Sequence, residues 1–311
     1  MQLKPELQNF IDGVANLKSY FTSIGFKQNQ SNTREALANV TRTYMTDIDL
    51  TMFIIDDVVM HGNYPVPIRI YHPSNKLNSA PVAVFIHGGG HMCGSIAVYD
   101  GIARKLCKVS QHIIIAIDYR LAPEFAYPIG LNDSKAVIEN AYQLLDAHGF
   151  KYTHQDLTLI GDSGGGAFCA TLTQDESFVL RNNITKQVLL YPSLDYTLSS
   201  KSIDELASGY FLEKAKVEWY ITNYFQNNEN YHELSPLFNP LHSNMPKTLI
   251  LVASHDPLRD EGVAYHEKLL LNSTDSELYR AAGVLHAYLM LENLCKEECE
   301  KSYTKISEFL K

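Results

Sequence analysis

A serine flanked by glycines is the first feature of the sequence that could do chemistry. The segment at 161–165 reads GDSGG and fits the pattern G-x-S-x-G, between an apolar run at 157–160 and a stretch with helical spacing. A serine on such a strand-to-helix turn is strained and exposed, and the flanking glycines leave room for the turn. Ser163 is therefore a candidate nucleophile. The alternative, a phosphate-binding loop, lacks the lysine of a P-loop and the G-x-G-x-x-G spacing.

Three consecutive glycines follow an earlier apolar run at 82–86, in the HGGG segment at 87–90. Acyl transfer places negative charge on a former carbonyl oxygen, and converging backbone N–H groups stabilise that charge. We expect the amides of Gly88, Gly89 and Gly164 to form such an oxyanion hole. The alternative is a flexible turn without a catalytic role.

A serine nucleophile of this kind needs a base and an acid later in the chain, in the order Ser, Asp or Glu, His. His286 follows the apolar run 277–285 and is the candidate base. Asp256 follows the run 248–253, where a loop at the carboxyl end of a sheet would carry it into a cleft. Asp195 follows the preceding apolar run and is the alternative acid. The histidine would take the serine proton, and the acid would orient the histidine.

Short apolar runs alternate with helical stretches along most of the chain, and this pattern predicts an α/β fold. The candidate catalytic residues would be positioned by the ends of its strands. The expected strands are 52–60, 65–72, 82–86, 113–117, 157–160, 188–191, 248–253 and 277–285. The expected helices between them are about 96–109, 131–148, 165–173 and 258–271. The N-terminal residues 1–45 have helical spacing. The long interval 195–242 lacks a core strand and is either an inserted cap or an extended crossover.

The composition narrows the classes of partner and compartment. The net charge of −9 disfavours binding to nucleic acid. The N-terminus lacks the apolar core of a signal peptide, and no run of 18 apolar residues occurs, so we expect no membrane span and a cytoplasmic location. The five cysteines are odd in number and scattered, which indicates reduced thiols. Cys295 and Cys299 lie four apart and share a helix face. No metal or cofactor is expected.

The motifs together resemble the hormone-sensitive lipase family of esterases, over about residues 50–290. The stretches that carry the resemblance are HGGG (87–90), DYRLAPE (118–124), YPIGLND (127–133), GDSGGG (161–166), SGYFL (208–212), DPLRDEG (256–262) and LHAY (285–288). The resemblance implies an α/β-hydrolase fold with a mostly parallel eight-stranded sheet. It implies a helical cap from 1–45 and 195–240, and a catalytic domain from 46–194 and 241–311. It also favours Asp256 over Asp195.

The resemblance implies a serine carboxylesterase that hydrolyses short-chain acyl esters through an acyl-enzyme. An amidase or deacetylase with the same triad is the main alternative. A ligand-binding protein on this fold is a further one, since the plant gibberellin receptor resembles the family but lacks the catalytic histidine. Because Ser163, Asp256 and His286 are all present in this chain, a non-catalytic binding protein is disfavoured. The expected partner is a small acyl ester. Because relatives in the family often dimerise, the resemblance also implies a possible homodimer.

Two residues depart from the family pattern. Gly164 replaces a usual alanine but keeps its N–H group. His91 follows HGGG where aromatic or apolar residues are common, and we expect it to be a tolerated polar neighbour at the edge of the cleft. The alternative is that it contacts the acyl group or alters the pH dependence. The resemblance implies structural roles for Arg120 and Glu124, which are expected to pair.

Overall fold

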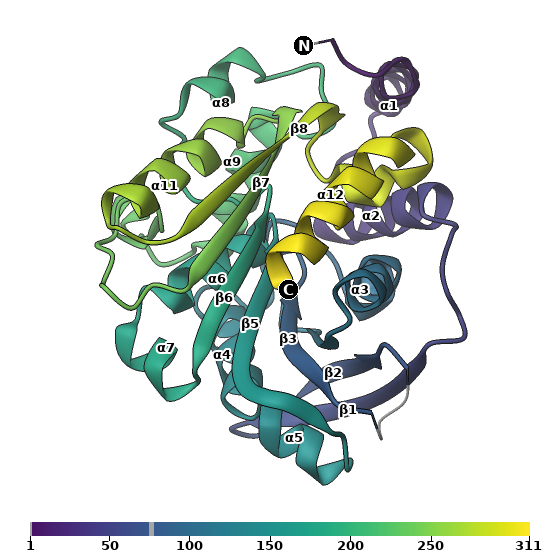
Figure 1. The fold of residues 1–311 in the computed structure, drawn as a ribbon. Helices are drawn as coiled ribbons and strands as arrows, with labels where there is room; N and C mark the ends of the chain where they lie inside the picture. Colours follow the sequence, from purple (N-terminus) through teal and green to yellow (C-terminus); the bar gives the residue numbers. More distant parts are fainter. Residues whose placement is uncertain (1, 75–77) are drawn as a thin grey trace.

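The computed structural model describes residues 2–74 and 78–311, and these form one sheet with helices on both faces (Figure 1). Within these residues the sheet has eight strands in the order β1-β2-β4-β3-β5-β6-β7-β8. The strands are β1 (Phe53–His61), β2 (Tyr64–His72), β3 (Ala80–Ile86), β4 (Ile113–Ile117), β5 (Tyr152–Asp162), β6 (Ile184–Leu190), β7 (Lys247–His255) and β8 (Ser276–Leu285). The β1–β2 and β2–β4 pairs are antiparallel, and all the other pairs are parallel. The predicted mostly parallel sheet is confirmed.

The central strands are buried on both faces, which explains their continuous apolar runs. All residues of β4 are buried. In β3 the side chains of Val82, Val84 and Ile86 belong to one core cluster, while Ala83 and Phe85 belong to another. Because successive side chains of a strand point to opposite faces, these two clusters are the two layers between sheet and helices.

Helices cover each face. One layer contains α4 (Ile129–Glu139), α5 (Ala141–Ala147), α6 (Gly164–Thr173), α7 (Glu176–Arg181) and α11 (Arg259–Leu271), and the other contains α3 (Ile96–Ser110), the 3₁₀ helix η1 (Tyr288–Leu294) and α12 (Lys296–Leu310). The helix expected over 131–148 is in fact two helices. They meet at Asn140, whose side-chain amide donates to the carbonyl of Ala136 and competes with a regular helical turn.

The segments expected to form a cap are helical. They contain α1 (Pro5–Ser23), α2 (Gln30–Tyr44), α8 (Lys201–Glu205), α9 (Lys214–Tyr224) and α10 (Tyr231–Leu234). The two segments contact each other, because the rings of Phe10 and Phe211 lie 5.3 Å apart and Lys18 forms an ion pair with Glu213. In Figure 1, α1 and α2 lie on the same side of the sheet as α12 and α3.

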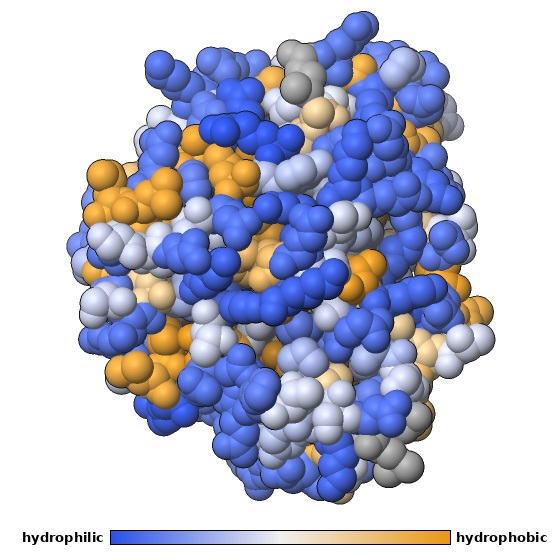
Figure 2. All heavy atoms as spheres, viewed as in Figure 1, coloured by the Kyte–Doolittle hydropathy of each residue, from blue (hydrophilic) through white to orange (hydrophobic). Residues whose placement is uncertain are grey.

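The surface in Figure 2 is mostly hydrophilic, with separate hydrophobic patches. In the part of the chain that the structure describes, none of the helices combines the length and the apolar character that crossing a membrane requires.

Candidate active site

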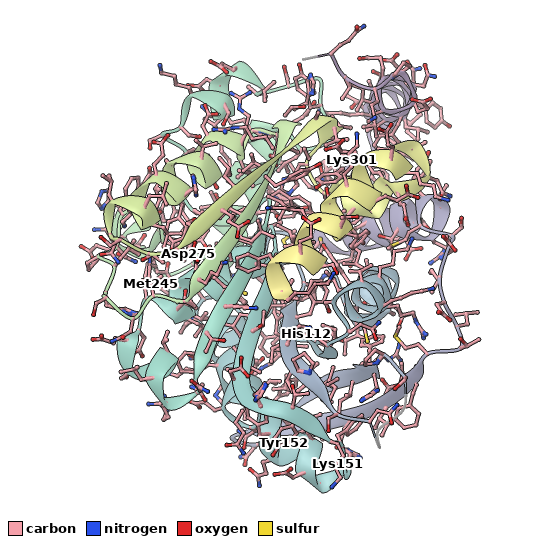
Figure 3. All side chains as sticks on the ribbon, viewed as in Figure 1. His112, Lys151, Tyr152, Met245, Asp275 and Lys301 are labelled. Atoms are coloured by element: carbon pink, nitrogen blue, oxygen red, sulfur yellow. The ribbon has the colours of Figure 1, made fainter. Side chains whose placement is uncertain are left out.

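Ser163 occupies the turn between β5 and α6, with φ 51° and ψ −117°. Such a backbone is strained for a residue with a side chain, and strain of this kind gathers at functional sites. A Cβ atom at Gly161 would lie 2.3 Å from the carbonyl oxygen of Gly165, and one at Gly165 would lie 2.0 Å from that of Ile86. The flanking glycines are therefore required by space. Figure 3 labels Tyr152 at the lower end of β5, so Ser163 follows the opposite, carboxyl end of that strand.

A histidine and an aspartate meet Ser163 at this edge of the sheet. His286, directly after β8, has its Nε2 atom 3.0 Å from the Oγ atom of Ser163. Its Nδ1 atom lies 2.8 Å from Oδ2 of Asp256, which follows β7. The other oxygen of Asp256 accepts the backbone N–H of Leu258, which fixes the carboxylate. The three side chains are buried and arranged as a nucleophile, a base and the acid that orients it.

The alternative acid, Asp195, is used differently. One of its oxygens accepts the backbone N–H and hydroxyl of Thr197, and the other accepts the same two groups of Ser199. Asp195 therefore closes its own loop. The structure brings Asp256, and not Asp195, to His286.

The three expected oxyanion donors are placed differently from one another. The N–H of Gly88 donates to Oδ1 of Asp162 at 2.5 Å, so this amide already has an acceptor. Gly89 and Gly90 follow with φ values of 104° and 62°, which favour glycine. Gly164 is the first residue of α6, where N–H groups have no partner within the helix. The Gly88 amide was expected to bind an oxyanion, but in the structure the carboxylate of Asp162 competes for this donor.

Asp162 is a residue of the candidate site that the sequence analysis did not single out. Burial raises the pKa of this carboxyl to about 7, although the hydrogen bond from Gly88 and the charge of His286 oppose the rise. Its place in the GDSGG segment was visible, but only the folded chain shows that its side chain reaches the HGGG loop. Asp162 thereby links the loop to the turn that carries Ser163.

His87, the first residue of the HGGG loop, is held by two aromatic side chains. Its ring stacks between Tyr119, at 4.4 Å, and Tyr99, at 5.2 Å. Burial lowers the pKa of His87 to about 4, so its ring is neutral near pH 7. The hydroxyl of Tyr119 donates to the carbonyl of His87. This packing holds both the ring and the carbonyl of His87, directly before Gly88.

His91, expected as a polar neighbour at the edge of the cleft, lies beside Gly164 inside an aromatic cluster. The residue is 5% exposed, and its ring stacks against Phe168 and Tyr224. The sequence alone does not predict that this polar side chain lies inside an aromatic cluster.

The expected pair of Arg120 and Glu124 is also wrong. Arg120 forms an ion pair with the buried Asp133, and Glu124 forms one with Arg34 of α2. The physical reason is that 118–124 is not helical, so a spacing of four does not put two side chains on one face.

Cys295 and Cys299 are buried thiols whose Sγ atoms lie 3.7 Å apart. Over residues 2–74 and 78–311, no group of three or more His, Cys, Asp or Glu side chains is arranged to hold a metal ion.

Comparison with known proteins agrees with this geometry. A family model described as alpha/beta hydrolase fold matches residues 83–290. The chain belongs to the α/β-hydrolase fold family. Members similar to it include an arylesterase of Saccharolobus solfataricus, 31% identical over 299 residues that cover 93% of each chain. The carboxylesterase NlhH of Mycobacterium tuberculosis is 32% identical over 237 residues, which cover 73% of this chain and 72% of the relative.

The solved structures give the same α/β-hydrolase fold. A hyperthermophilic esterase from Pyrobaculum calidifontis superimposes with a TM-score of 0.89 at 26% identity, covering 100% of this chain and 98% of the other. The resemblance inferred from the motifs and the predicted fold class are both confirmed. An α/β-hydrolase with a serine, histidine and aspartate in hydrogen-bonding contact has the groups needed for acyl transfer.

Proposed function

We propose that the protein is a serine carboxylesterase that hydrolyses short-chain acyl esters through an acyl-enzyme. The observation that carries the proposal is the contact of Ser163 Oγ with His286 Nε2, with His286 Nδ1 held by Asp256. The curated relatives named as arylesterase, carboxylesterase and ethyl acetate hydrolase support the same reaction class.

The proposed mechanism uses the two contacts of His286 for each proton transfer. Nδ1–H of His286 donates to Asp256, which leaves the Nε2 lone pair free to accept the Ser163 proton. The Oγ atom then bonds to the acyl carbon, and the alcohol leaves with the proton that His286 carried. Water attacks the acyl-enzyme, gives one proton to His286 and releases the acid, after which the proton returns to Ser163.

The oxyanion of each tetrahedral intermediate needs N–H donors. We propose Gly89 and Gly164, as the sequence indicated, and Gly90 in place of Gly88, whose amide donates to Asp162. The Gly88 contact would then hold the loop while its neighbours bind the oxyanion. Donors fixed in advance in this way stabilise developing charge without reorganisation.

We also propose that 1–45 and 195–240 act as a helical cap on a catalytic domain of 46–194 and 241–311. Supporting contacts come from α9: the Tyr220 ring would lie 2.4 Å from a Cβ at Gly90, and Tyr224 stacks on His91. The cap therefore touches the loop that we assign to oxyanion binding. Its side chains would then set the size of the acyl and alcohol pockets.

A cytoplasmic location is part of the proposal, supported by five cysteines that are all free thiols. Fractionation of cells that express the protein would test the location. Light scattering of the purified protein would test the homodimer that the family resemblance raises.

The experiment that tests the function is hydrolysis of p-nitrophenyl esters from acetyl to dodecanoyl, with wild type and Ser163→Ala side by side. We expect a short-chain optimum in the wild type and loss of nearly all activity in the variant. A folded wild type that hydrolyses no ester would overturn the proposal. Anilides with matched acyl groups would then show whether the same triad cleaves amides.

A further inference from the structure

The side chain of His91 is sandwiched between two aromatic rings. The ring centroid of Tyr224, in α9, lies 4.1 Å away, and that of Phe168, in α6, lies 4.5 Å away. Tyr196 closes a third side, with its hydroxyl 3.2 Å from His91 Nε2. The backbone is fixed as well, because the carbonyl of His91 accepts the N–H of Ala122. The ring therefore has little freedom to move.

This ring fills the space beside Gly164, the residue after the nucleophile. A Cβ atom at Gly164 would lie 3.0 Å from Cε1 and 3.1 Å from Nδ1 of His91. Such contacts are tighter than those that real Cβ atoms normally make, so one partner would have to shift. Gly164 is a helical residue with no positive φ, and its backbone does not demand glycine. The space taken by His91 explains the glycine.

The ring is not placed to act as an acid or a base. Burial, with a smaller contribution from His87, lowers the pKa of His91 to about 3, so the imidazole is neutral at ordinary pH. Nδ1, the atom nearest Gly164 after Cε1, is buried and lacks a hydrogen-bond partner among the described residues. The contact of Nε2 with the Tyr196 hydroxyl and the packing of the two aromatic rings hold the imidazole, while its Nδ1 edge faces Gly164.

We propose that His91 is a positioning residue for the reaction of Ser163: its clamped ring packs against Gly164 and holds the amide that follows the nucleophile. This inference rests on the proposed function, because that amide is one of the assigned oxyanion donors. The two departures from the family pattern, at positions 91 and 164, are then one matched change. Neither residue should tolerate replacement independently of the other.

A double-mutant cycle tests the pair. The variants are Gly164→Ala and His91→Asn, alone and combined. Asparagine removes Cε1, the atom that would meet the new Cβ most closely, and its shorter side chain is free to turn the atom that replaces Nδ1 away from the 3.1 Å contact. The backbone N of His91, 3.3 Å from that Cβ, stays in place in both backgrounds. Gly13→Ala is the matched control, because nothing lies within 4 Å of a Cβ there. Steady-state kcat and KM with p-nitrophenyl acetate, inhibition by a trifluoromethyl ketone and thermal unfolding are measured for all variants.

In the wild-type background we expect Gly164→Ala to lower kcat by about 10-fold with little change in KM, because a displaced oxyanion donor affects the transition state more than the ground state. Inhibition by the trifluoromethyl ketone should weaken in parallel, since its adduct carries an oxyanion. In the His91→Asn background the same alanine should lower kcat by about threefold or less, because contacting residues couple while distant ones add. The Gly13→Ala change should be additive with His91→Asn.

Equal losses of kcat from Gly164→Ala in both backgrounds would overturn the proposal, and so would an effect confined to KM. If His91→Asn lowers the melting temperature too far for assay, His91→Gln supplies a second smaller, unringed side chain. A wild type without esterase activity would sink the proposed function and the positioning role together. Coupling in the melting temperatures would then still show that the ring and Gly164 pack as described, which separates the two failures.

Discussion

The backbone N–H of Gly88 donates a hydrogen bond to the carboxylate of Asp162, the residue immediately before Ser163. This single contact joins the HGGG loop after β3 to the strained turn after β5. The two segments supply the proposed oxyanion donors and the nucleophile, and their relative position decides whether both can reach one acyl group. Geometry of this kind must hold within a fraction of an ångström.

Removal of the Asp162 carboxylate should therefore impair catalysis. We expect Asp162→Ala to lower kcat by roughly 10-fold or more, since displaced catalytic groups lose rate steeply. Asp162→Asn should retain more activity, because its side-chain oxygen can still accept the Gly88 N–H. Asp146→Asn, at an exposed position, is the control. Equal kcat values for the alanine variant and wild type would refute a role for the contact.

Asp162 should also shape the pH dependence of stability. Its pKa rises from an ordinary value of 3.8 to about 7 in the folded chain. Between these values the folded state binds more protons than the unfolded state, so the contribution of Asp162 to the unfolding free energy falls as pH rises. Below pH 4 and above pH 7 that contribution is flat. Asp162→Asn removes the titration.

Urea unfolding of wild type and Asp162→Asn from pH 4 to pH 8 would measure this contribution. The difference in unfolding free energy, wild type minus variant, should decline across the window and then level off. Other buried groups titrate as well, and the subtraction removes those that do not contact Asp162. A difference that stays constant with pH would show that Asp162 keeps its ordinary pKa in the fold.

The assignment of the acid makes a paired prediction. Asp256→Asn should lower kcat by about 10⁴-fold, because an amide cannot hold the histidine in the tautomer that accepts the serine proton. Asp195→Asn is the matched control, since Asp195 is equally buried but its carboxylate accepts hydrogen bonds from Thr197 and Ser199 of its own loop. We expect Asp195→Asn to lower the melting temperature but to leave kcat close to that of the wild type. The reverse pattern would transfer the catalytic role to Asp195.

The sequence predicted those parts of the molecule that depend on order and pattern. Apolar runs gave the strands, and the order Ser, Asp, His placed Ser163, Asp256 and His286 after three different strands. Parallel strands bring their carboxyl ends to one edge, so the three residues were expected to meet, and they do.

Contacts made by side chains across loops could not be predicted. Asp162 reaches Gly88 over 74 positions, and Arg120 finds Asp133 instead of its near neighbour Glu124. Such partners depend on the path of irregular backbone segments. These segments have no periodic sequence pattern from which their path could be predicted. The burial of His91 has the same origin, because its aromatic neighbours come from helices distant in the sequence.

Arg34 links the N-terminal helices to the proposed oxyanion loop and supports a last prediction. From α2 its guanidinium donates to the carbonyl of Met92 at 2.8 Å and to that of Ala122 at 2.9 Å, while it pairs with Glu124. One planar group therefore ties two loops to the proposed cap, and a lysine cannot reproduce this fork.

We expect Arg34→Ala to lower kcat by about 10-fold and to cost about 1–3 kcal/mol in unfolding free energy, because two backbone acceptors lose a charged donor. Arg34→Lys should recover only part of either loss. Arg42→Ala is the control in the same helix, because Arg42 is exposed and its guanidinium donates to Asn39 of that helix. Stability lost without any change in kcat would mean that Arg34 holds the N-terminal helices in place but does not position the loop for catalysis.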